Sequence, residues 1–85
     1  MLIGVVDRAG TRRCAFALAI PVVAAALRDD GHVDVYDPDL PRDRWRVTRT
    51  ATGVEVGAPP PTLFDPDPTQ PVWVARLIEA TIQLL

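Results

Sequence analysis

A few side chains in the sequence have the chemistry for metal binding or acid–base catalysis: His32, Asp34 and Asp37, with the single cysteine, Cys14. The alternation of residues 32–36 predicts a strand with His32 and Asp34 on one face. Two or three hard ligands, with Cys14 far away in sequence, are too few for a zinc site. Carboxylates in a wet, proline-rich loop also lack the unequal environments that acid and base roles require. We therefore expect no metal site and no catalytic residue.

The residue types that are missing exclude several classes of enzyme. All nine basic residues are arginine, and the chain contains no lysine, serine or asparagine. There is thus no serine nucleophile, no Schiff-base lysine and no phosphate-loop lysine. The formal net charge of −2 argues against a general polyanion binder. We expect a protein without catalytic activity and without a cofactor.

One arginine-rich segment is a candidate contact for nucleic acid. Its residues are Arg42, Arg44, Trp45, Arg46 and Arg49, a combination that contacts phosphate and stacks on a base in other proteins. The alternative is that Trp45 points into the core while the arginines pair with nearby aspartates. We favour this alternative, because the acidic neighbours cancel much of the field that a nucleic acid would experience.

Apolar patterning predicts one small α+β domain, a two-layer sandwich spanning residues 1–85. Strands are expected near 2–7, 11–18, 32–36, 44–50 and 54–57, in a mixed sheet of four or five strands. Two helices, at about 21–30 and 70–85, are expected to cover this sheet. A proline-rich connector at 57–70 is expected to lie across the surface before the last helix.

Residues 11–20 allow two interpretations. Their alternation suits a strand that closes a hairpin, while their composition also suits a helix from Thr11 that is kinked at Pro21. We favour the strand, because proline removes a helical hydrogen bond. Arg12, Arg13 and the apolar stretch after them also imitate an export signal, but Pro21 splits that stretch. We expect this segment to be retained as core.

Residues 2–37 resemble the opening β-α-β unit of Rossmann-like proteins. The likeness lies in the Ile3-Gly4-Val5-Val6 strand, a helix ending before Gly31, and a second strand followed by Asp37. In the dinucleotide-binding families that this unit resembles, an acid at the position of Asp37 holds the ribose. The phosphate-binding turn of those families needs three spaced glycines, and residues 7–11 supply only Gly10. The likeness covers less than half of the chain, and we expect no dinucleotide site.

The C-terminal helix is apolar over most of its circumference. Its polar residues Arg76, Glu79 and Gln83 form one narrow stripe, with apolar side chains on both flanks. We assign the flank with Val74, Ile78 and Ile82 to the core. The opposite flank, with Trp73, Leu77 and Leu84, is the predicted partner interface.

These observations predict a non-catalytic protein–protein interaction or assembly module. Its partner would be a second copy of the chain, a larger assembly, or both; a structural or accessory component of a phage fits this description. The arginine-rich composition is typical of GC-rich coding, so an actinobacterial or phage-like source is expected. The alternative function is a small nucleic-acid- or nucleotide-binding module built on residues 42–49. We expect a cytoplasmic or virion location, no secretion and no contact with membranes.

Overall fold

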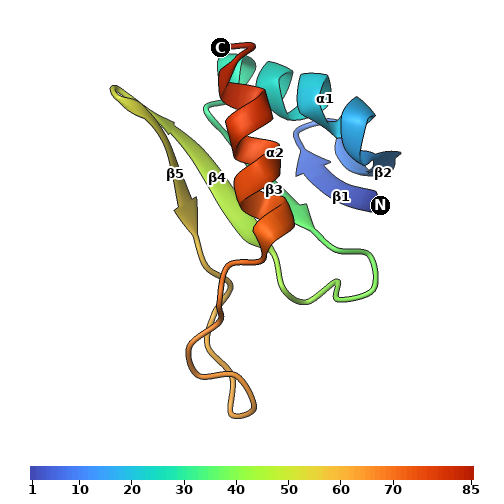
Figure 1. Ribbon diagram of the computed structural model, residues 1–85, viewed down its shortest axis with the longest axis vertical. Helices are drawn as coiled ribbons and strands as arrows, with labels where there is room; N and C mark the ends of the chain where they lie inside the picture. Colours follow the sequence, from blue (N-terminus) through green and yellow to red (C-terminus); the bar gives the residue numbers. More distant parts are fainter.

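The computed structural model describes residues 1–85, which form one sheet and two helices (Figure 1). In chain order the elements are β1 (Leu2–Asp7), β2 (Gly10–Ala15), α1 (Phe16–Asp29), β3 (His32–Tyr36), β4 (Trp45–Thr50), β5 (Gly53–Gly57) and α2 (Val72–Ile82). The strands lie in the order β2-β1-β3-β4-β5, and every neighbouring pair is antiparallel. The predicted α+β fold is confirmed, and its sheet is antiparallel throughout in place of the expected mixed sheet.

The connection through α1 differs from a Rossmann-like unit. Strand β1 is antiparallel to both β2 and β3, so β2 and β3 run in the same direction with β1 between them. The crossover helix therefore follows β2, which makes a split β-α-β unit. The register pairs Gly4 with Tyr36, so the end of β3 lies beside the start of β1. Asp37 is thus at the opposite end of β1 from the turn at Gly10, and the two cannot share a nucleotide.

Residues 11–20 combine the two interpretations. Strand β2 ends at Ala15, earlier than predicted, and α1 begins at Phe16, five residues before the predicted start. The backbone N–H of Phe16 donates to the carbonyl of Met1 (3.0 Å), which closes the hairpin where the helix starts. Pro21 lies inside α1 and is exposed, as is Ala17 one turn earlier. The carbonyl that loses its helical partner is therefore on the side that water reaches.

The core lies between one face of the sheet and the two helices. Alternate residues of β1, β3 and β4 point inward and meet the buried stripes of α1 and α2. The buried cluster consists of Ile3, Val5, Ala19, Val23, Ala26, Leu27, Val33, Val35, Trp45, Val47, Val74 and Leu77. Because both helices pack on the same side, the other face of the sheet is left open. Neither helix is both long and apolar enough to cross a membrane.

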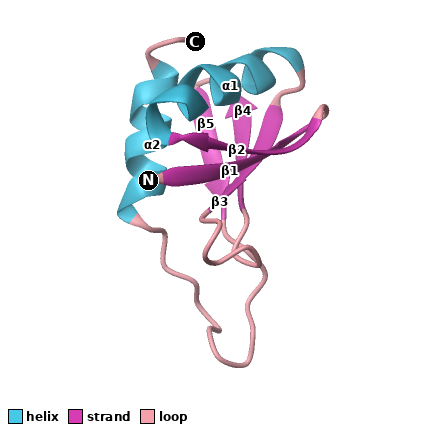
Figure 2. Ribbon diagram, turned by 90° about the vertical axis from the view of Figure 1, so that its right-hand side faces the viewer, coloured by secondary structure: helices cyan, strands magenta, loops and turns pink.

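The connector between β5 and α2 contains no helix or strand and projects beyond the end of the sheet (Figures 1 and 2). The sequence-based expectation that the connector lies across the surface is therefore wrong. At its outer part the N–H of Thr62 donates to the carbonyl of Asp65 (2.9 Å), and the N–H of Asp65 donates to Thr62 Oγ1 (3.0 Å). This turn presents Leu63 and Phe64, which are 94% and 99% exposed.

Candidate functional site

The structure agrees only in part with the predicted buried and exposed faces of α2. Leu77 is fully buried beside Val74, so the assignment of Leu77 to a contact face is wrong. Ile82, assigned to the core, is 43% exposed. Helix α2 packs against α1 as well as against the sheet, which turns its inward direction toward the stripe that contains Leu77. Among the predicted contact residues, Trp73 is half-buried and Leu84 is exposed.

The exposed apolar side chains of this region lie at the C-terminal end of α2. We define the C-terminal apolar patch as Ile82, Leu84 and Leu85, each of which is exposed. The segment is held in place, because Arg28 Nη1 donates to the carbonyl of Leu84 (3.0 Å). Two backbone hydrogen bonds, from Leu84 to Thr81 and from Leu85 to Ile82, continue the last turn. The helical pattern indicated an apolar surplus on α2, but it did not indicate that Leu85 is exposed.

The arginine-rich segment does not form one surface. Trp45 is only 4% exposed and belongs to the core, as the favoured interpretation of the sequence predicted. Arg44 lies over the ring of Tyr36, with 5.5 Å between the guanidinium carbon and the ring centroid. The register places Arg46 on the open face and Arg49 on the helix-covered side with Trp45.

Arg46 is occupied by a partner within the domain. Its Nε donates to Asp34 Oδ1 (2.9 Å), and its Nη2 donates to Asp34 Oδ2 (3.3 Å). The hydrogen bond with Asp34, and then the charge of that carboxylate, raise the pKa of the Arg46 guanidinium. This two-point contact removes Asp34 from any metal site with His32.

The other candidate ligands are also separated. Asp37 Oδ1 accepts the N–H of Asp39 (2.9 Å) at the far end of β3, and Cys14 packs against the core. No group of three histidine, cysteine, aspartate or glutamate side chains is placed to hold a metal ion.

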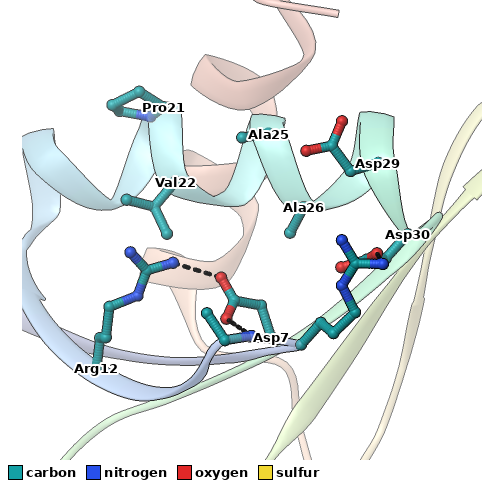
Figure 3. Close-up of a pocket in the computed structure, with 10 residues that line it drawn as sticks. Asp7, Arg12, Pro21, Val22, Ala25, Ala26, Asp29 and Asp30 are labelled. Carbon is teal, nitrogen blue, oxygen red and sulfur yellow. Dashed lines mark hydrogen bonds and ion pairs between the residues drawn. The ribbon is translucent and has the colours of Figure 1, made fainter.

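A pocket of about 370 Å³ lies between α1 and the turn that joins β1 to β2 (Figure 3). Its carboxylates are largely engaged by arginines. Asp7 accepts hydrogen bonds from the N–H of Ala9 (2.9 Å) and from the Arg12 guanidinium, and Arg8 lies 3.6 Å from Asp30. The lining contains no serine, cysteine or histidine, and therefore no serine or cysteine nucleophile paired with a histidine base. The Arg8–Asp30 pair joins the hairpin turn to the end of α1, whereas the Asp7–Arg12 pair lies within the hairpin.

No protein-family model, curated protein or solved structure matches this chain.

Proposed function

We propose that this domain is a non-catalytic protein–protein interaction module that uses the C-terminal apolar patch as a contact surface. The observation that carries the proposal is where the exposed large hydrophobic side chains lie. Three of the ten, Ile82, Leu84 and Leu85, lie at the C-terminal end of α2, whereas Leu63 and Phe64 belong to the connector, which projects from the opposite end of the domain (Figure 1). A concentration of exposed apolar side chains at one end of a domain is typical of sites that contact other proteins.

A second copy of the chain is the simplest partner. Full burial of a leucine-sized side chain is worth about 1.5–3 kcal/mol. The patch is already about half-buried, so two facing patches gain roughly 4–9 kcal/mol between them. Loss of translational and rotational freedom costs about 4–15 kcal/mol. The expected self-association through this patch alone is therefore weak.

Light scattering over a wide range of protein concentrations tests this proposal. We expect the molar mass to rise with concentration, and Leu84→Asp to keep it at the monomer value while circular dichroism stays unchanged. Leu18→Asp is the matched control, because Leu18 is 63% exposed on α1, away from the patch. A wild-type chain that remains monomeric at millimolar concentration, or an equal effect of both variants, contradicts self-association through this patch.

A further inference from the structure

The two tryptophans of the chain line one small pocket at the N-terminal end of α2. Trp45 comes from the start of β4 and Trp73 from the first turn of α2. They line a pocket of about 140 Å³ together with Leu40 and the connector residues Pro68, Thr69 and Pro71. Ligand pockets for drug-sized molecules measure about 300–1,000 Å³, whereas one water occupies about 30 Å³. The pocket is therefore the size of a single side-chain head group.

The charges around this pocket have one sign. Asp37, Asp43 and Asp65 complete its lining, and no arginine or histidine is among the lining residues. Three aspartates at other pockets of the domain are paired with arginines, namely Asp7 with Arg12, Asp30 with Arg8, and Asp34 with Arg46, whereas Asp29 and Asp39 are not paired. None of the three carboxylates at the tryptophan pocket has such an ion pair within the chain. A ligand with positive charge would supply the missing partner.

The tryptophan rings also favour a cationic ligand, for a reason that is independent of the carboxylates. The face of an indole ring carries negative potential and attracts guanidinium and ammonium groups, more strongly than tyrosine or phenylalanine does. Trp73 is half-buried and Trp45 is only 4% exposed, so most of the ring surface that a ligand can reach belongs to Trp73. Both rings are packed in or against the core and need little ordering when a ligand enters. A neutral apolar ligand would satisfy the rings but leave three carboxylates beside it without a partner.

We propose that the pocket between Trp45 and Trp73 binds one guanidinium or ammonium head group, supplied by an arginine or lysine side chain of a protein partner. The lining of this pocket supports the positive charge of the ligand. That the ligand is a protein side chain rests on the proposed interaction function. Asp43 is the central acidic residue for a test, because its side chain makes no hydrogen bond within the domain, whereas Asp37 caps its own turn.

Tryptophan fluorescence gives a direct measurement, because every tryptophan of the chain lines this pocket. N-acetyl-arginine amide is titrated into the intact protein, with N-acetyl-citrulline amide as the uncharged probe of nearly the same shape. We expect a saturable change in emission with the arginine probe at a Kd of about 1–10 mM, as suits a single side chain. The citrulline probe should give no saturable change. Binding should weaken as salt is raised, because these charges are partly exposed.

Two variants locate the binding. Asp43→Asn should weaken the arginine probe about two- to fivefold, the range expected for loss of one partly exposed charge pair. Asp29→Asn is the matched control, since Asp29 is an exposed aspartate at the pocket of Figure 3, and it should leave the affinity unchanged. Equal binding of the citrulline probe, or an equal loss in both variants, would show that charge at this pocket does not select the ligand. Absence of saturation at ~50 mM probe also overturns the proposal.

The result separates this inference from the proposed function. If the arginine probe binds but the molar mass never depends on Leu84, the cation site stands and self-association through the C-terminal apolar patch fails. If Leu84→Asp dissolves an oligomer while neither probe binds, the interaction module stands and the cation site fails.

Discussion

The ring of Tyr36 lies flat against the backbone of Gly4, on the face of the sheet that the helices leave open. The two residues are paired across β1 and β3, and a Cβ atom at Gly4 would lie 2.2 Å from the ring carbon Cζ. Tyr36 is consequently 5% exposed although no helix covers it. Arg44 stacks on the same ring, so this contact organises the middle of the open face.

Replacement of Gly4 by alanine should displace the Tyr36 ring and lower the free energy of unfolding by about 1–3 kcal/mol, the usual cost of overpacking. Chemical denaturation measures this loss. Gly57→Ala is the matched control, because its Cβ would meet only atoms at 3.8 Å or beyond. If the two variants are equally stable, the Tyr36 ring has another favourable position.

Pro21→Ala should stabilise the domain. Alanine restores a hydrogen bond from position 21 to the carbonyl of Ala17, and proline inside a helix is about 3 kcal/mol less favourable than alanine. The greater freedom of the unfolded chain offsets about 1 kcal/mol of this gain. We expect a rise in Tm of about 4–8 °C per kcal/mol gained. Pro41→Ala in an exposed loop should give no rise. A lower Tm for Pro21→Ala would mean that packing of α1 requires the bend.

The elements predicted best are those whose signals are local. Val33 and Val35 alternate with polar residues, and this period of two identifies β3 without reference to any other part of the chain. Pro21 is a local signal that a tertiary effect overrides. Helix α1 buries Ala19 and Val23 on either side of it, and this packing outweighs one missing hydrogen bond.

The orientation of α2 and the polar contacts depend on neighbours that the local pattern does not specify. The two flanks of α2 are similarly apolar, so the position of α1 decides that Leu77 is buried. Trp45 and Trp73, far apart in sequence, meet only because the start of β4 lies below the first turn of α2. The pairing of Arg8 with Asp30 likewise joins two turns and has no signature in a single segment.

The buried position of Leu77 leads to a prediction opposite to the one from sequence. Leu77→Ala should lower the free energy of unfolding by about 2–5 kcal/mol, because it leaves a cavity between α2 and the sheet. Ile82→Ala, at an exposed position of the same helix, should cost less than about 1 kcal/mol. Urea denaturation of both variants measures the difference. If Ile82→Ala is the more damaging, α2 is rotated relative to the orientation described above.

Nucleic-acid binding through the arginine-rich segment should be absent or very weak. Trp45 is buried, Arg44 stacks on Tyr36, and Arg46 is held at two points by Asp34. Fluorescence anisotropy with a labelled duplex oligonucleotide should show no saturable binding at ~50 mM salt, where phosphate contacts are strong. If the wild type does bind, the slope of the logarithm of its binding constant against the logarithm of salt concentration can be compared with that of Arg46→Gln. A slope smaller in magnitude by about 0.9 in the variant would mean that Arg46 leaves Asp34 and contacts a phosphate. Arg49→Gln, on the helix-covered side of the sheet, is the control that should not change such a slope.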